Sequence, residues 1–300
     1  MTNNELLQDR LQKIRQIIKK YGEENFYISF SGGKDSTVLS ALIDMALPDN
    51  KIPRVYANTG IEYKMIIDFV ESLKLSDDRI IILKPQKSIL QTLKEEGYPF
   101  KSKFHSKILR EYQRSGKLRS VKVYLGEEGK TMGKNMCPEI LKYQFTQEFN
   151  LKISPKCCDR LKKDPMHKWA KENNKLYYIN GIMADEGGQL DTAKCLAFDG
   201  NKLKGFQPMA PMTKAWEDWI IEKYNIEICD IYKPPYNFLR TGCKGCPFAL
   251  NLQEELNTLE KFFPGEYKQC EIIWAPIYKE YRRLNYRLKQ FQQKTIKDFL

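Results

Sequence analysis

The sequence predicts an α/β fold built on a doubly wound, mostly parallel sheet. Three segments rich in β-branched and aromatic residues, 26–30, 54–60 and 79–83, alternate with stretches of helical periodicity. This alternation indicates parallel strands joined by right-handed helical crossovers. A further strand is expected at 176–182, after a long interruption. Because ligands of such sheets lie at the carboxyl ends of the strands, we expect the functional site at that edge.

The expected helices follow from apolar residues at helical spacing with charged residues between them. In chain order they cover about 5–20, a run from 36, about 62–73, 215–224, 252–263 and 267–292. Pro264 and Gly265 separate the last two, since this pair breaks a helix. Trp216 and Trp219, three residues apart, are expected to pack in the core.

Length and composition suggest one broad domain with appended helices. The 300 residues, 42% of them hydrophobic, can bury a large core. We expect an N-terminal helix at 1–21, an α/β domain at 22–250 and a helical extension at 251–300. A basic insertion at about 84–150 interrupts the domain.

The charge balance and the cysteine content narrow the function classes. A net charge of +12 favours a polyanionic partner or nucleotide substrates, although a solvated lysine-rich surface explains it equally well. With no signal-like start and no apolar run of membrane-spanning length, we expect a soluble, cytoplasmic protein that does not associate with membranes. Its eight cysteines are then expected as thiols, so clustered ones indicate metal or redox chemistry.

Residues 31–36, Ser-Gly-Gly-Lys-Asp-Ser, lie between the first strand and a helix. The two glycines let the backbone approach a ligand closely, and the first N–H groups of the helix face the same hollow. Lys34 adds a mobile cation. The Walker pattern G-x-x-x-x-G-K-[ST] does not fit here, so this is a different anion-binding loop. A simple structural turn would not need Lys34 and Asp35 beside it.

This loop resembles the pyrophosphate loop (PP-loop) of the ATP pyrophosphatase superfamily, whose members adenylate substrates or bind adenylyl sulfates. The resemblance implies ATP or adenylyl sulfate as ligand, Mg²⁺ with it, and catalytic roles for Lys34 and Asp35. Similar enzymes have Asp-Thr-Gly after the second strand, where this chain has Asn58 first. The implied nucleotide-binding residues are Ser29, Ser31, Gly32, Gly33, Lys34, Asp35, Ser36, Asn58, Thr59, Gly60 and Gly181.

Four cysteines form two close pairs that lie far apart in the chain. Cys157 and Cys158 are adjacent, and 84 residues separate them from Cys243-Lys-Gly-Cys246. The C-x-x-C spacing lets two thiolates bind one centre, and the adjacent pair supplies two more. The set suits zinc, while the adjacent pair alone could equally be unligated thiols.

A Cys-Cys pair followed about eighty residues later by C-x-x-C resembles the cluster signature of adenylylsulfate reductases, to which DNA phosphorothioation enzymes are similar. The resemblance implies a 4Fe-4S cluster held by Cys157, Cys158, Cys243 and Cys246. Because the first pair precedes the helix that leads into the strand at 176–182 and the second follows the next helix, we expect all four at one centre, at the mouth of the nucleotide site. Over about 22–250 the chain resembles the phosphoadenosine phosphosulfate reductase-like family, which implies an adenine nucleotide alpha hydrolase-like fold. An electron- or sulfur-donating protein is a further implied partner.

Two features depart from the sulfonucleotide reductases themselves. Met183 stands where an arginine for the sulfate is expected, and the last residues lack their Glu-Cys-Gly segment. We therefore predict an enzyme that uses ATP or an adenylyl nucleotide in iron–sulfur-dependent sulfur chemistry, by adenylation and sulfur transfer. One alternative is a sulfonucleotide reductase with Cys270 or another thiol as nucleophile. Another is a nucleic-acid-binding module with structural zinc.

The basic insertion allows two interpretations. Basic residues interleaved with aromatic ones are typical of surfaces that hold a phosphate backbone and stack bases. A covering helix with its charged face in solvent would have the same composition. The acceptor, whether a nucleic acid or another sulfur acceptor, stays open. The residues concerned are Tyr98, Phe100, Lys101, Lys103, Phe104, His105, Lys107, Arg110, Tyr112, Arg114, Lys117, Arg119 and Lys122.

Overall fold

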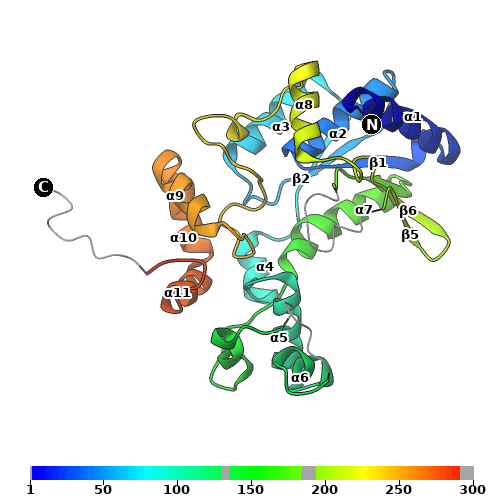
Figure 1. Ribbon diagram of the computed structural model, residues 1–300. Coiled ribbons are helices and arrows are strands. Elements are labelled where there is room, and N and C mark those ends of the chain that lie inside the picture. Colours follow the sequence, from blue (N-terminus) through cyan, green and yellow to red (C-terminus); the bar gives the residue numbers. More distant parts are fainter. Residues whose placement is uncertain (1, 130–135, 184–193, 291–300) are drawn as a thin grey trace, which may run out of the picture. The chain divides into compact units, whose positions relative to one another are not determined.

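The chain forms two compact units in a computed structural model that describes residues 2–129, 136–183 and 194–290 (Figure 1). The first unit comprises Met1–Gln86 and Lys162–Thr241, and the second comprises Lys87–Leu161 and Gly242–Leu300. These boundaries differ from the expected ones: the insertion and the C-terminal extension fold together as the second unit, instead of being separate additions to one domain.

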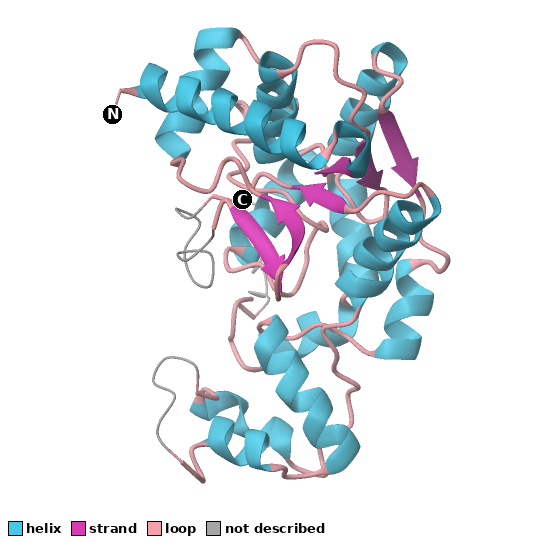
Figure 2. Ribbon diagram, turned by 90° about the vertical axis from the view of Figure 1, so that its right-hand side faces the viewer, coloured by secondary structure: helices cyan, strands magenta, loops and turns pink. Residues whose placement is uncertain are grey.

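The first unit contains a sheet of six strands, drawn in magenta in Figure 2, in the order β3-β2-β1-β4-β6-β5. All neighbouring pairs are parallel except β5 and β6. The chain proceeds from β1 outward to β3 and then returns to the other side of β1 with β4, so a switch point lies between β1 and β4. The strands are β1 Phe26–Phe30, β2 Arg54–Ala57, β3 Ile80–Leu83, β4 Tyr177–Ile179, β5 Leu196–Asp199 and β6 Lys202–Phe206.

Helices cover both faces of this sheet, which confirms the predicted α/β class. On one face, Ala170 packs against Tyr27 of β1 and Val55 of β2. Side chains alternate along a strand, so Phe26 and Ile28 face the other side, where α2 packs on β1. The helices of this unit are α1 Asn3–Tyr21, α2 Lys34–Ala46, α3 Lys64–Ser76, α7 Asp164–Glu172 and α8 Lys214–Tyr224.

The hairpin formed by β5 and β6 is absent from the sequence-based expectations. Gly200-Asn201 turns the chain between Asp199 and Lys202, and Gly200 has φ +58°. A Gly-Asn pair between two short strand-like runs is the local signal that would have found it. Gly205 of β6 lies under the ring of Tyr178, because a Cβ there would be only 2.2 Å from a ring carbon.

The second unit is helical, and its apolar core encloses a buried polar group. Its helices are α4 Ile89–Glu96, α5 Lys103–Ser115, α6 Arg119–Leu125, α9 Leu252–Phe262, α10 Pro264–Ile273 and α11 Ala275–Arg283. His105 is buried between the hydroxyl of Tyr124, 2.8 Å from Nδ1, and Oε1 of Gln144, 2.8 Å from Nε2. Burial lowers the pKa of His105 to about 4. His105 and the fully buried Phe100 therefore belong to the core and are not available to a nucleic acid.

The expected helix at 267–292 is instead two helices, α10 and α11, which meet at Trp274. Pro276 lies in the first turn of α11, where its missing N–H costs nothing, but it cannot continue α10. Among the described residues, no helix combines the length and the apolar character needed to cross a membrane.

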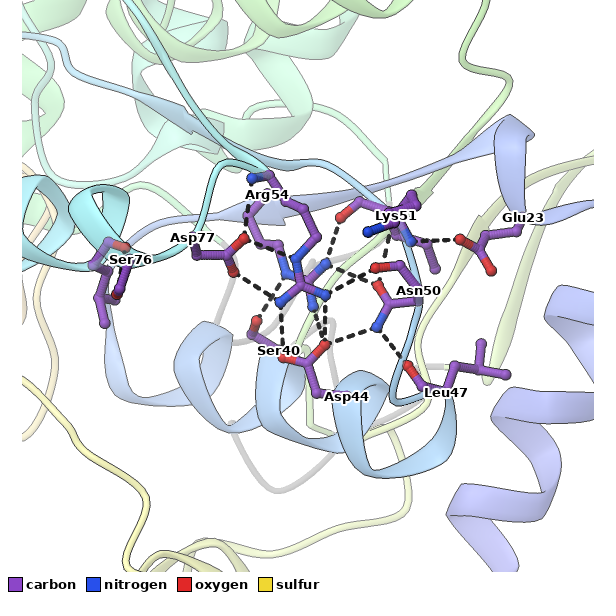
Figure 3. A network of polar contacts seen from close by, with 12 residues as sticks. Glu23, Ser40, Asp44, Leu47, Asn50, Lys51, Arg54, Ser76 and Asp77 are labelled. Carbon is purple, nitrogen blue, oxygen red and sulfur yellow. Dashed lines mark hydrogen bonds and ion pairs between the residues drawn. The ribbon is translucent and has the colours of Figure 1, made fainter.

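A charged network secures the amino ends of β2 and β3, away from the edge where ligands are expected (Figure 3). Arg54, fully buried, donates to Asn50 Oδ1 at 2.9 Å and to Asp44 at 2.5 Å. Arg79 reaches the same carboxylate of Asp44 at 2.9 Å and also pairs with Asp77 at 2.8 Å. Asp44 of α2 therefore ties the helix to the start of two strands.

Candidate functional site

The loop between β1 and α2 is closed by its own hydrogen bonds. The backbone N–H of Ser31 donates to Ser36 Oγ at 3.2 Å, and that hydroxyl donates to the carbonyl of Gly33 at 3.0 Å. Gly32 adopts φ +68°, and a Cβ there would lie 2.5 Å from Val70. The loop is thus rigid before any ligand arrives, with the first N–H groups of α2 beside it.

Two hydroxyl groups from the end of the first unit lie over this loop. A Cβ on Gly33 would be 3.2 Å from the hydroxyl of Tyr232 and 3.7 Å from Oγ1 of Thr241. These two hydroxyls also hydrogen-bond each other. Burial raises the pKa of Tyr232, so its hydroxyl stays protonated and can donate to an anion. No motif marks either residue, and the sequence analysis missed both.

Lysines and carboxylates alternate where α2 meets α8. Lys34 Nζ lies 2.8 Å from Asp218 and 3.5 Å from Glu217. Lys214 Nζ lies 2.6 Å from Asp35 and 3.3 Å from Glu217. The two helices thereby place two cations and three carboxylates beside the loop, and only Lys34 and Asp35 were expected from the sequence.

The carboxyl groups of Asp35 and Glu217 have opposite pKa shifts. Burial, and then the charge of Asp35, raise the pKa of Glu217 to about 7. Burial also pushes the pKa of Asp35 upward, but the hydrogen bond from Lys214 and further interactions hold it below its ordinary value. Glu217 is fully buried, and its Oε1 has no hydrogen-bond partner in the described part of the chain. A buried oxygen of this kind can accept a ligand cation or donor.

The end of β4 approaches the same loop. A Cβ on Gly181 would lie 2.8 Å from the carbonyl oxygen of Asp35, so glycine is required for this close approach. Next to it, Oδ1 of Asn180 is buried and lacks a hydrogen-bond partner among the described residues. The switch point of the sheet therefore lies beside the loop, as the fold predicts.

The Asn-Thr-Gly turn after β2 is only partly open to a ligand. Asn58 Oδ1 accepts the N–H of Gly60 at 3.0 Å, and space is open around Gly60. Thr59 Oγ1 donates to the buried Glu62 at 2.7 Å, and Lys162 pairs with this carboxylate at 3.1 Å.

Two other positions of interest make contacts within the protein. Ser29 donates to Met166 Sδ at 3.8 Å, because it lies on the face of the sheet that α7 covers. Met183 is fully buried, so this position supplies neither a charge nor an exposed side chain to a sulfate.

All four paired cysteines belong to the second unit. The pKa of Cys157 is raised by Cys158, by burial and by the charges of Cys246 and Cys243. Burial, then Cys243 and Cys158, raise the pKa of Cys246. The thiols therefore lie within electrostatic reach of one another, and none of them is in a disulfide.

The four thiols are the candidate ligands of a metal centre. In the described ranges, no three His, Cys, Asp or Glu side chains are placed as a single metal ion requires. Zinc needs its four sulfurs at about 2.3 Å from one point, whereas a 4Fe-4S cluster binds each thiolate at a different iron atom.

Side chains of the last helices fix the C-x-x-C turn. Trp274 Nε1 donates to the carbonyl of Lys244 at 3.1 Å, and the hydroxyl of Tyr278 donates to that of Gly245 at 2.5 Å. Tyr281 donates to the carbonyl of Pro247 at 2.8 Å. These bonds hold the backbone between and after the two cysteines in one conformation.

Cys270 lies directly beneath this turn. Gly245 has φ +60°, and a Cβ there would be 2.8 Å from Cys270 Sγ. Cys270 is fully buried, and burial raises its pKa to about 12. Burial and a raised pKa do not favour Cys270 as the nucleophile of the reductase alternative, because an attacking thiol must be accessible and ionised.

Comparison with known proteins shows a partial likeness. The family model of the phosphoadenosine phosphosulfate reductase domain matches residues 25–133. An uncharacterized protein of Methanocaldococcus jannaschii is 36% identical over 103 residues, which are 31% of this chain and 25% of that protein. This chain thus matches about a quarter of the length of that curated relative.

Solved structures give weaker likenesses. A phosphoadenylyl-sulfate reductase from Candida auris has a TM-score of 0.40 and 11% identity, over 74% of this chain and 88% of its own. An NH3-dependent NAD synthetase from Campylobacter jejuni has a TM-score of 0.42 and 12% identity, over 97% of this chain and 100% of its own. The U34-tRNA thiolase NcsA from Methanococcus maripaludis, solved with its [4Fe-4S] cluster, has a TM-score of 0.38 and 15% identity, over 97% of this chain and 83% of its own. Likeness at this level carries no argument about function. What the comparisons establish is a segment, residues 25–133, that is similar to the phosphoadenosine phosphosulfate reductase domain.

Proposed function

We propose that this protein is an enzyme that binds ATP or a related adenylyl nucleotide at the loop of residues 31–36 and uses it in iron–sulfur-dependent sulfur chemistry. The observation that carries the proposal is the rigid loop at the switch point of the sheet, with helix N–H groups and Lys34 beside it. The match to the phosphoadenosine phosphosulfate reductase domain covers the loop and supports a nucleotide ligand.

The loop would bind the phosphates and stabilise the charge that develops on leaving pyrophosphate. Donors already fixed before the reaction, such as the N–H groups of α2 and the Tyr232 hydroxyl, need no reorganisation as charge develops. Lys34 would exchange its carboxylate partner Asp218 for a phosphate oxygen. Lys214 keeps Asp35 ionised throughout.

A magnesium ion fits the same place. Asp35 and Glu217 would hold it, since Mg²⁺ binds through one or two carboxylates together with substrate phosphates. Oε1 of Glu217, which has no hydrogen-bond partner among the described residues, would be one oxygen ligand of the ion. When bound, the ion would neutralise negative charge on the phosphates.

An iron–sulfur cluster fits the thiols of the second unit. Cys157, Cys158, Cys243 and Cys246 would hold it, and it would supply electron- or sulfur-transfer chemistry. The hydrogen bonds from Trp274 and Tyr278 would keep the C-x-x-C turn in the conformation in which its two thiols hold the cluster.

Nucleotide turnover tests the first part of the proposal. We expect Lys34→Ala and Asp35→Ala to abolish cleavage between the α and β phosphates of ATP, measured as AMP and pyrophosphate release in the presence of candidate acceptors. Lys74→Ala, an exposed lysine of α3, is the matched control and should retain activity. Normal binding and turnover in the Lys34 and Asp35 variants would refute the nucleotide site.

Metal analysis tests the second part. Protein purified without oxygen should contain iron and sulfide and absorb visible light, and Cys243→Ser should lose both. Cys195→Ser, at a cysteine outside the two pairs, is the control that should keep them. Zinc in place of iron would contradict the cluster while leaving the nucleotide site untouched.

A further inference from the structure

A groove in the second unit has no part in the proposed reaction. It lies between the later turns of α5 and the segment 146–153, with a volume of about 700 Å³. None of the candidate nucleotide or metal residues lines it. Among its lining residues are Glu96, Arg110, Tyr112, Arg114, Phe149 and Lys152.

The far wall of the groove is fixed to α5 through the backbone. Gln113 donates from Nε2 to the carbonyl of Leu151 at 2.8 Å and accepts the N–H of Ile153 on Oε1 at 3.1 Å. Tyr98 and Ser154 continue the attachment, because the N–H of Tyr98 donates to Lys152 O at 2.8 Å and that of Ser154 to Tyr98 O at 2.8 Å. A groove built in this way has a defined shape before a ligand binds.

The lining has an excess of positive charge. Three cations, Arg110, Arg114 and Lys152, face one carboxylate, that of Glu96. Glu96 is already paired with Arg110 at 3.3 Å and with Arg160 at 2.8 Å. Arg114 is exposed and makes no ion pair within the described ranges. The groove therefore favours an anion, and Arg114 is available to meet it.

Two half-exposed aromatic rings lie among these cations. Tyr112 is backed by Phe145 at a centroid distance of 5.5 Å, and Phe149 is backed by Tyr143 at 5.7 Å. Because each ring packs against another aromatic ring, it can present its free edge or face to a planar group in the groove. Phe100, by contrast, is buried in the core and offers none.

We propose that this groove binds a single-stranded segment of a polynucleotide. Arginine and lysine would hold the phosphates, and bases would stack on Tyr112 and Phe149, the combination that single-stranded nucleic acids use in other proteins. The groove is of the size that encloses nucleotide-like ligands. The inference goes beyond the proposed function and does not depend on it, since the groove uses neither the loop of residues 31–36 nor the paired cysteines.

Fluorescence anisotropy with short labelled oligonucleotides, without ATP, tests the proposal. The full-length protein is titrated with single-stranded RNA, single-stranded DNA and duplex over a range of salt concentrations. We expect both single strands, or one of them, to bind more tightly than duplex. The variant Arg114→Ala/Lys152→Ala should bind at least tenfold more weakly, with a salt slope smaller by about one to two because two phosphate contacts are lost.

The control removes the same charge elsewhere on α5. Lys103 and Lys107 are exposed residues outside the groove, so Lys103→Ala/Lys107→Ala should bind almost normally. Tyr112→Leu should weaken binding about tenfold without changing the salt slope, because stacking is not ionic. Three results would each overturn the proposal. These are an equal loss of affinity in Arg114→Ala/Lys152→Ala and Lys103→Ala/Lys107→Ala, tighter binding of duplex than of single strands, and no binding of any oligonucleotide by the wild type. Circular dichroism of every variant separates loss of binding from loss of fold.

Discussion

At the scale of single residues, a few atoms determine where the candidate site can form. Gly181 is the clearest case, because the strand end and the first turn of α2 meet at this position with no room for a side chain. The sequence analysis named Gly181 from a resemblance, whereas the structure gives the physical requirement. Lys214, Glu217, Tyr232 and Thr241 were missed because their relation to the loop exists only after residues nearly two hundred positions apart fold together.

Gly181→Ala should therefore damage the nucleotide site. The added methyl would lie 2.8 Å from the carbonyl oxygen of Asp35, and a backbone atom cannot move aside as a flexible side chain does. We expect a loss of about 1–3 kcal/mol in the free energy of unfolding, measured with urea, and weaker ATP binding by calorimetry. Gly265→Ala, in α10 with open space around it, should change neither quantity appreciably.

His105 should make the stability of the protein depend on pH. Its pKa is about 4 in the folded state against an ordinary value of 6.5, so the unfolded chain takes up the proton first. The contribution of neutral His105 to the free energy of unfolding is therefore complete above about pH 6.5. It is lost as the pH falls toward about 4, and the total loss is about 3 kcal/mol. Urea unfolding at several pH values should show this loss in the wild type and in His167→Gln, an exposed histidine, but not in His105→Gln. An unchanged slope in His105→Gln would show that other groups cause it.

At the scale of elements, local sequence patterns predicted the strands well, whereas contacts between distant parts of the chain could not be predicted. The alternation of strands and helices gave β1, β2, β3 and β4, because each is encoded by a contiguous run of residues. The division of the last helix at Pro276 and the β5–β6 hairpin at Gly200 had local signals that were not used. The hydrogen bonds from α11 to the C-x-x-C turn have no local sequence signal, since the spacing of tyrosines along a helix does not determine which carbonyl each one will reach.

The charged network of Figure 3 should be essential to the first unit. Asp44→Ala leaves the guanidinium of Arg54 buried without its carboxylate, and removing one partner of a buried pair costs about 3–5 kcal/mol. Asp68→Ala removes an exposed ion pair with Lys64 and should cost less than about 1 kcal/mol. Thermal and urea unfolding compare the two variants. A similar small cost for both would mean that water reaches Arg54 when Asp44 is absent.

At the scale of the whole molecule, the chain passes between its two units three times, and the paired cysteines lie beside the second and third passages in the sequence. Cys157 and Cys158 precede the boundary at Leu161, and Cys243 follows the boundary at Thr241. No Pro-, Gly- or Ser-rich linker marks either boundary, which is why the sequence did not predict them. Thr241 itself lies over Gly33 of the candidate nucleotide loop.

Removal of the metal should therefore weaken nucleotide binding through Thr241. A metal held by Cys243 and Cys246 would restrict the chain two residues beyond Thr241, and the hydroxyl of Thr241 would then stay in place over the loop with that of Tyr232. We expect the metal-free protein to bind ATP about fivefold or more weakly than the loaded protein, and by linkage ATP should slow metal loss to a chelator. Calorimetry and iron release measure the two effects. In Thr241→Val, which keeps the shape but not the hydroxyl, loaded and metal-free proteins should bind ATP equally. Persistence of the full difference in that variant would show that the coupling takes another route.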